Sequence, residues 1–376
     1  MQRLIQTISL ALLLGIGSLN IHAQDKQKTP LRDSLDGALD VSYFLASLYG
    51  FLPFAMPVTE PAVGYGVAGG PIFIHRDIEA LKRGDPAPPS LSFVGGLYTE
   101  NGTWGIGGGH SGIWKNDQIR YVGAALYASV NLTYYPTLIP LEYKFNLETF
   151  FFMQQIAFRL GKIKLFGGLR YQIAGTKVTF ERILDIPGVD PWEIENTLGG
   201  AGPVLFLDYR DNTFTPNKGV YAKAGYTYFA PWLGGDVSYH TNSLYGIWYS
   251  NPLSWLVTGI RAEFQSSWGD IPFFAKPYVN LRGIPVMRFQ DFYTLTFETE
   301  ERFDLTKRWS LTAFGGLAKA FDPAKDFSDY DWAYNYGGGF RYKIARLFDL
   351  YTGLDFAWGP DSWGFYIIFG HAWNRL

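Results

Sequence analysis

The chain has 376 residues, a formal net charge of −2 and no cysteine. The absence of cysteine from this chain excludes disulfide frameworks, zinc fingers and thiol nucleophiles, and the near-neutral charge gives no sign of a nucleic-acid partner. Aromatic residues make up 18% of the chain and glycines number 43, a combination of large rings and glycines that is unusual for a soluble protein.

The first residues predict an export signal. Arg3 precedes the apolar run LIQTISLALLLGIG, and the A-x-A-like sequence IHA ends at Ala23. We therefore expect residues 1–23 to be a signal peptide, although an uncleaved amphipathic helix is the alternative. The apolar run is too short for a membrane-spanning helix, and the residue after the cut is Gln24, so no lipoprotein anchor is expected.

Residues 24–50 predict a periplasmic leader that contains a short helix. The stretch QDKQKTPLRDSLDGALD is polar, and we expect it to be mobile. A short amphipathic helix that ends at Gly50 is predicted after it, because apolar residues recur there at helical spacing. These residues are Val41, Phe44, Leu45 and Leu48.

From about residue 51 to the end, the sequence alternates as β-strands do. LYTGLDFAWG, GVYAKAGYTYF and WLVTGIRAEFQ each place an apolar face opposite a face of glycine and charged residues. Turn signals such as Asn101-Gly102 separate these segments. A soluble β-sandwich would alternate in the same way, so alternation alone does not choose between a sandwich and a membrane barrel.

Two features favour the barrel. The faces opposite the apolar ones are too polar for a dry core but suit a wet lumen. Aromatic residues gather near the strand ends, as they do at membrane interfaces: Tyr134, Tyr135, Trp232, Trp248, Trp309, Trp358, Trp363 and Trp373. We therefore predict an all-β fold, a transmembrane antiparallel β-barrel over residues 51–376.

The strand count predicts sixteen strands. Fifteen strands are plain between residues 64 and 373, and bacterial single-chain barrels have an even number. The short stretch FLPFAMPV, residues 51–58, supplies the first strand, with TEPAVG as its hairpin. Both termini then lie in the periplasm, with mostly short turns on that side; the long connection at 77–89 is an exception.

Three stretches of the second half occur in a familiar order: LDYRDNTFTPNKGVYAKAGY (207–226), IPFFAKPYVNLRGIPVMRF (271–289) and ETEERFDLTKRWSLTAFGGLAKAF (298–321). This ordered set resembles the C-terminal barrel of the BamA/TamA family, the bacterial surface antigen barrels that insert or translocate proteins at outer membranes. The resemblance covers roughly residues 50–376 and is strongest from 196 to 321.

The resemblance implies that the loop with Arg282 and Gly283 folds back into the barrel, where its arginine reaches Glu300 and Phe314 on the wall. Strand parity independently places Glu300 and Phe314 on inward faces. An arginine can stack on the aromatic ring and pair with the carboxylate, and Gly283 permits a turn close to the wall. We call Arg282, Gly283, Glu300 and Phe314 the loop latch; an ordinary solvated loop is the alternative.

Further charged residues are predicted to face the lumen: Glu298, Arg302, Arg341, Lys343 and Asp355. The carboxylates superficially suggest a hydrolytic pair, but compensation by the arginines and the lysine is simpler. His110 and Ser111 are adjacent in a strand and face opposite ways, and DFSDYD (326–331) lacks the spacing of an EF-hand. We expect no enzyme activity, no metal and no cofactor.

The sequence departs from the family pattern in several places. We expect the periplasmic polypeptide-transport repeats that usually precede the barrel to be missing here. Gly316 stands where an acidic residue is expected, and Ile284 replaces the aromatic that commonly follows Arg-Gly. The chain ends in HAWNRL and not in a terminal phenylalanine. These departures put the assembly activity in doubt more than the architecture.

Three functions stay open at this point. The first is assembly or export of outer-membrane or surface proteins through a lateral seam between the first and last strands, by β-augmentation. The second is a passive pore. The third is a structural or partner-binding barrel in a larger outer-membrane complex. The expected partners are outer-membrane lipid, client proteins, and partner subunits or further copies of the chain, in a Gram-negative bacterium.

Overall fold

The computed structural model describes residues 31–47, 52–75, 90–134, 143–181 and 193–373. The predicted signal peptide, residues 1–23, lies outside these ranges. Within them the chain forms one α-helix, α2 (Ser42–Ser47), and sixteen strands. The strands are β1 (Leu52–Glu60), β2 (Gly64–Ile74), β3 (Leu91–Thr99), β4 (Trp104–Trp114), β5 (Ile119–Tyr134), β6 (Tyr143–Arg159), β7 (Leu165–Phe180), β8 (Glu193–Asp208), β9 (Gly219–Phe229), β10 (Tyr239–Leu253), β11 (Leu256–Gly269), β12 (Tyr293–Asp304), β13 (Trp309–Phe321), β14 (Ala333–Ala345), β15 (Leu350–Trp358) and β16 (Trp363–Phe369).

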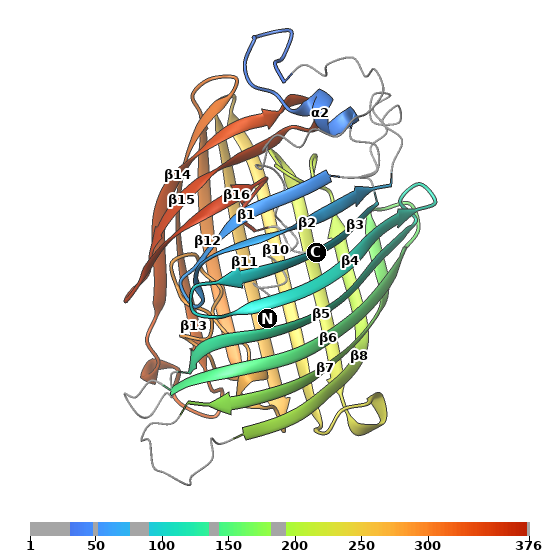
Figure 1. The fold of residues 1–376 in the computed structure, drawn as a ribbon, viewed down its shortest axis with the longest axis vertical. Helices are drawn as coiled ribbons and strands as arrows, with labels where there is room; N and C mark the ends of the chain where they lie inside the picture. The colour runs from blue at the N-terminus through green and yellow to red at the C-terminus, as the bar shows by residue number, and fades with distance from the viewer. Residues whose placement is uncertain (1–30, 48–51, 76–89, 135–142, 182–192, 374–376) are drawn as a thin grey trace.

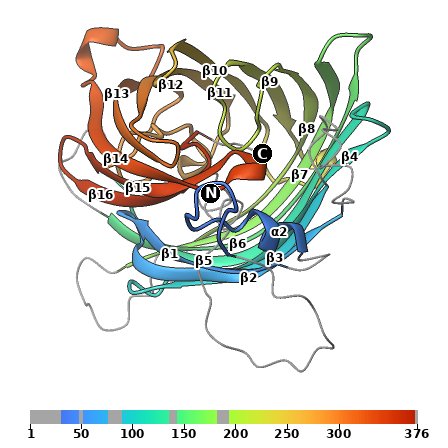
Figure 2. The same ribbon diagram turned by 90° about the horizontal axis from the view of Figure 1, so that it is seen from above.

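The strands form one sheet in which each strand pairs antiparallel with the next in chain order. The sheet curls round until β1 lies beside β16 (Figures 1 and 2). The predicted sixteen-strand antiparallel barrel is therefore confirmed, and its least obvious strand, expected at 51–58, is β1. Because the number of strands is even, β1 begins and β16 ends at the same end of the barrel, where α2 also lies. We call this the α2 end and the other the loop end.

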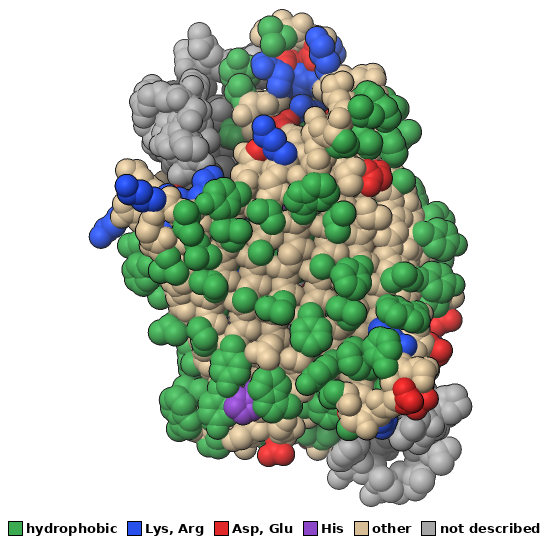
Figure 3. Space-filling model, turned by 180° about the vertical axis from the view of Figure 1, so that it is seen from behind, with side chains coloured by type: hydrophobic (Ala, Val, Ile, Leu, Met, Phe, Trp, Pro, Cys, Tyr) green, Lys and Arg blue, Asp and Glu red, His purple; other side chains and the backbone are tan. Residues whose placement is uncertain are grey.

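Side chains alternate between the outer wall and the lumen as the period of two requires. In β12, Phe297 is 49% exposed, whereas the next residue, Glu298, is 3% exposed. Seen from behind, the middle of the barrel is covered largely by hydrophobic side chains, and charged ones gather toward the two ends (Figure 3). Five of the predicted interfacial aromatics are exposed on this outer surface: Trp232, Trp248, Trp309, Trp358 and Trp363.

Two aromatics of that predicted set face the lumen instead. Tyr134 packs on Phe273 of the β11–β12 loop, with 4.8 Å between the ring centroids. Trp373 is buried, because the chain turns inward after β16 at Gly370, whose φ is +75°. Tyr135 lies outside the described residues.

The lumen is also less uniformly polar than the sequence predicted. Beside a few polar ones such as Thr149 and Thr176, many inward side chains on β5, β6 and β7 are apolar and buried: Leu126, Val130, Leu132, Phe145, Leu147, Phe151 and Val178. Phe273 packs against this wall, 5.7 Å from the ring of Phe145 and 5.6 Å from that of Phe180. The reason is local, since this part of the lumen receives the apolar side of an inward loop.

The leader that we expected to be mobile is docked on the barrel over its described part, residues 31–47. Arg308, in the β12–β13 turn, forms ion pairs with three carboxylates of this segment: Asp33 at 2.6 Å, Asp36 at 2.7 Å and Asp40 at 2.6 Å. The backbone N–H of Val41 also donates to the carbonyl of Ile344 at 2.8 Å. The prediction missed this because the partners of the three aspartates lie more than 260 positions away.

Helix α2 follows directly from this anchor. Asp40 accepts the N–H of Ser42 at 2.7 Å, and so satisfies a free donor at the start of the helix. The helix lies over the mouth of the barrel (Figures 1 and 2). The predicted end at Gly50 lies outside the described residues. No helix in the described ranges has the length and apolar character needed to cross a membrane.

Candidate functional site

The connection between β11 and β12, residues 270–292, leaves the wall at the loop end and turns into the lumen. Its middle is enclosed: Val279, Leu281 and Ile284 are each at most 1% exposed. Gly283 has a φ of +83°, and a Cβ on it would lie 3.0 Å from the carbonyl carbon of Ala357 in β15. Only glycine combines this left-handed conformation with so close an approach to the wall.

Arg282 points from this loop into a set of carboxylates on the wall. Its Nη1 lies 2.7 Å from Glu300 and 2.5 Å from Asp355, and its Nη2 lies 3.1 Å from Glu298. The guanidinium also lies over the ring of Phe314, 3.5 Å from the centroid. The contacts that the resemblance implied, to Glu300 and Phe314, are thus present, and two further carboxylates join them.

Two more arginines complete the cluster. Arg341 of β14 contacts Asp355 at 2.5 Å, and Arg261 of β11 contacts Glu298 at 3.1 Å. Three guanidinium groups therefore face the carboxylates of Glu298, Glu300 and Asp355, and Arg261 also contacts a fourth buried carboxylate, that of Glu263, at 3.5 Å. In a buried site, such pairing and hydrogen bonding offset the cost of desolvation.

The structure explains the glycine at position 316, where the resemblance led us to expect an acidic residue. A Cβ at Gly316 would lie 2.8 Å from the side-chain oxygen of Asn335 and 3.0 Å from Leu281 of the loop, so no larger side chain fits. Asn335 donates instead to the carbonyl of Arg282 at 3.0 Å and to Glu298 at 3.2 Å. Arg282 receives its carboxylates from β12 and β15. Position 316 therefore does not need to carry an acidic residue.

Two of the predicted lumen charges lie apart from this cluster. Arg302 pairs with Asp304 at 2.8 Å, and Lys343 pairs with Asp349 at 2.6 Å, both near the α2 end. Both cations lie over the ring of Tyr351. The expected mutual compensation of charges is therefore present, but it is divided between two separate places.

Sequence reasoning missed the contacts that join the loop to the last hairpin. The N–H of Gly283 donates to the hydroxyl of Tyr366 in β16 at 2.7 Å, and Ser362 donates to the carbonyl of Gly283 at 2.5 Å. The indole N–H of Trp373 donates to Glu298 at 2.6 Å. The inward parity of Tyr366 was available from the sequence, whereas the inward turn after β16 was signalled only by Gly370.

The seam between β1 and β16 differs from the rest of the sheet. In the described part of the chain no strand pairing joins these two strands, although both pair fully on their other sides. They remain adjacent: the hydroxyl of Thr59 donates to the carbonyl of Phe365, and the rings of Tyr65 and Phe365 stack at 5.9 Å.

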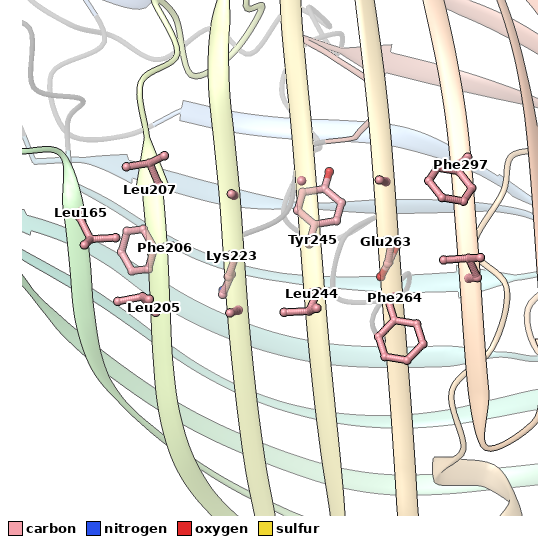
Figure 4. A pocket seen from close by; sticks show the side chains of 15 residues that line it. Leu165, Leu205, Phe206, Leu207, Lys223, Leu244, Tyr245, Glu263, Phe264 and Phe297 are labelled. Atoms are coloured by element: carbon pink, nitrogen blue, oxygen red, sulfur yellow. The ribbon is translucent and has the colours of Figure 1, made fainter. Parts of the chain in front are cut away.

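A shallow groove of about 400 Å³ lies on the wall formed by β7 to β12 (Figure 4). Its outward side chains are small along the floor, at Ala222, Ala224 and Gly246, and larger at the exposed Leu244 and Phe297. The lining is mostly apolar, although it also includes Lys223, Tyr245 and Glu263, and this mostly apolar surface suits contact with lipid.

A pair of histidines lies on the outer face near the α2 end. The hydroxyl of Ser92 lies 2.7 Å from Nε2 of His75 and 2.8 Å from Nδ1 of His110. His110 thus contacts Ser92 on the next strand and not its neighbour Ser111. In the ranges that the structure describes, no group of three or more potential ligands is placed to hold a metal ion.

Comparison with solved structures identifies the barrel. The structure of BamA from Haemophilus ducreyi lacking POTRA domains 1–3 matches with a TM-score of 0.57 at 10% identity, over 85% of this chain and 69% of that one. CdiB from Escherichia coli matches with a TM-score of 0.56 at 9% identity, over 84% of this chain and 62% of that one. No family model matches the sequence, and no curated protein does. The chain therefore has the sixteen-strand barrel fold of BamA and CdiB.

Proposed function

We propose that this chain is an outer-membrane barrel of a Gram-negative bacterium that assists the insertion or export of outer-membrane or surface proteins. The seam carries this proposal: all other neighbouring strands in the described residues are joined by hydrogen-bonded ladders, but the facing edges of β1 and β16 are not. An exposed strand edge is a ready template for another chain. The fold shared with BamA and CdiB supports the same class of function.

In this proposal the α2 end faces the periplasm. The predicted signal peptide would deliver the chain there, and the connections at this end include short turns, such as that between β12 and β13. Longer connections, such as residues 270–292 between β11 and β12, leave from the loop end, as the surface loops of bacterial barrels do.

The loop latch would hold the β16 side of the seam in place. Arg282 ties the loop to β12 and β15, and Gly283 ties it to β16 through Tyr366. The same loop, together with residues 31–47 over the mouth, occupies space that an open pore would need. We therefore favour assembly or export over passive conduction.

The test is the quantitative outer-membrane proteome after depletion of this protein. Selective loss of other barrels or surface proteins, with unchanged transcripts, is the expected result and would identify the clients. An unaltered proteome would contradict the proposal. Single-channel conductance of the purified barrel would then decide between a pore and a partner-binding subunit.

A further inference from the structure

The two edges of the seam differ in the number of backbone N–H donors that face it. On β1, proline residues reduce this number. Pro53 lies opposite Pro71 in the β1–β2 ladder, and neither has an N–H, so they cannot form a hydrogen-bonded pair. In an antiparallel ladder the backbone groups of a non-hydrogen-bonded pair point away from the partner. The carbonyl of Pro53 therefore points toward the seam.

The other end of β1 agrees. Thr59 lies opposite Tyr65, and the carbonyl of Tyr65 accepts the N–H of Glu100 on the far side, at 2.8 Å. Thr59 and Tyr65 are thus also a non-hydrogen-bonded pair, and the period of two runs between these points. The residues of β1 whose backbone faces the seam are Pro53, Ala55, Pro57 and Thr59. Two of these four have no N–H to donate.

The edge of β16 lacks no backbone N–H donor. The N–H of Gly370 donates to the carbonyl of Tyr351 at 2.7 Å, toward β15. Alternation then directs the backbone of every second residue toward the seam: Trp363, Phe365, Ile367 and Phe369. The hydrogen bond from Thr59 to the carbonyl of Phe365 agrees with this direction. All four residues carry both a donor and an acceptor.

The two edges also differ in what holds them. β16 is tied from the lumen side by the Gly283–Tyr366 hydrogen bond, and the tail beyond it by Trp373 to Glu298. An edge held in place loses less freedom when a new strand binds, so it is the better template. β1 is an edge whose prolines oppose strand addition, as they do on many protected edges.

We infer that the client segment pairs with the edge of β16, antiparallel to it, in the place of β1, and that β1 is the strand that moves aside. The partner is an extended segment with free backbone donors and acceptors and an apolar lipid-facing side. This inference rests on the proposed function, but it concerns only which edge the client uses.

The native chain has no cysteine, so single cysteines can report the edge directly. Ala55→Cys on β1 and Ile367→Cys on β16 are matched, since both positions face the seam and share the lipid-facing parity. Each purified barrel is incubated in detergent with a synthetic ten-residue strand of alternating apolar and polar residues that carries one cysteine, with copper phenanthroline and oxygen as the oxidant. The disulfide yield is then read on a non-reducing gel. The same peptide with proline at alternate positions is the control.

A several-fold higher yield at Ile367→Cys, lost with the proline peptide, is the expected result. A higher yield at Ala55→Cys would overturn the inference and leave the proposed function standing. No specific yield at either position, in barrels that still show heat-modifiable migration, would overturn both.

Restoring the missing donors gives a second test. Pro53→Ala combined with Pro57→Ala should let β1 pair with β16 and should lower the client yield at Ile367→Cys several-fold. Pro61→Ala, in the turn after β1, is the matched control and should leave the yield unchanged. An unchanged yield in the double variant would show that the prolines do not set the choice of edge.

Discussion

Arg282 and Arg308 are each bound by three carboxylates, yet they hold different kinds of structure. The partners of Arg282 come from two wall strands, β12 and β15. The partners of Arg308 come from a single short stretch, at Asp33, Asp36 and Asp40. The first arginine therefore joins a loop to the barrel wall, and the second joins a separate segment to one turn.

Their surroundings differ as well. Around Arg282 the carboxylates of Glu298 and Asp355 are at most 1% exposed and that of Glu300 is 11% exposed. Around Arg308 those of Asp33 and Asp40 are also nearly buried, at 1% and 3%, but that of Asp36 is 30% exposed. A buried charge that loses its partner has no water to replace it, but a rim charge does. The comparison teaches that similar coordination gives a fully enclosed contact in the lumen and, through Asp36, a partly hydrated one at the rim.

The largest expected effect follows from Arg282→Ala. It leaves the carboxylates of Glu298, Glu300 and Asp355 with less compensation, and breaking a buried pair costs about 3–5 kcal/mol. We expect a lower unfolding temperature in detergent and reduced heat-modifiable folded protein. A variant with normal folding and normal heat-modifiability would contradict the role of the latch.

Arg282→Lys should fall between Ala and the native arginine. Nε, Nη1 and Nη2 of Arg282 all contact carboxylates, and a lysine ammonium cannot reproduce this planar fork or its stacking on Phe314. The measurement is the same thermal unfolding curve. Full recovery of the native unfolding temperature would show that charge alone matters there.

Arg308→Ala should release residues 31–47 and leave the barrel folded. Limited proteolysis of the purified protein would then cut this segment faster, while the unfolding temperature changes much less than in Arg282→Ala. Lys177→Ala, which removes an exposed ion pair to Glu193 at the loop end, is the matched control and should change neither measurement. Unaltered proteolysis in Arg308→Ala would mean that other contacts hold the segment.

The smallest effect should come from pH. Hydrogen bonds to Arg346 and Arg308 lower the pKa of Asp33 and of Asp36, respectively. For Asp40, burial opposes the shift, but hydrogen bonds from Ser42 and Arg308 leave its pKa lowered too. Carboxyl groups with lowered pKa values stabilise docking fully above the ordinary aspartate value, about 3.9, and lose that contribution as the pH falls through the lowered values.

We therefore expect the cleavage rate of residues 31–47 by an acid-tolerant protease to stay constant between neutral pH and about pH 5, and to rise only in stronger acid. High salt should act in the same direction, because the rim is partly exposed. A rise already at pH 6 to 7 would point to a histidine and not to these aspartates.

The sequence alone determined the strands and their faces. A period of two predicted fifteen strands, and the even number expected of bacterial barrels added the first one. The same period placed Glu300 and Phe314 in the lumen, because the direction of a side chain in a strand depends only on its parity. The resemblance then added Arg282 as their partner. These features are local, or repeat along the chain, and so they can be read without knowing which strands meet.

Only the tertiary structure decided which inward side chains lie at the same level along the barrel axis and so contact one another. Asp355 reaches Arg282 across 73 positions and Trp373 reaches Glu298 across 75, distances that strand register and curvature set and that parity does not. The docking of Asp33 on Arg308 spans 275 positions. The inward turn of Trp373 depended on a single backbone conformation, at Gly370. The presence of inward charges of both signs was visible in the sequence, whereas the choice of partners required the curled sheet.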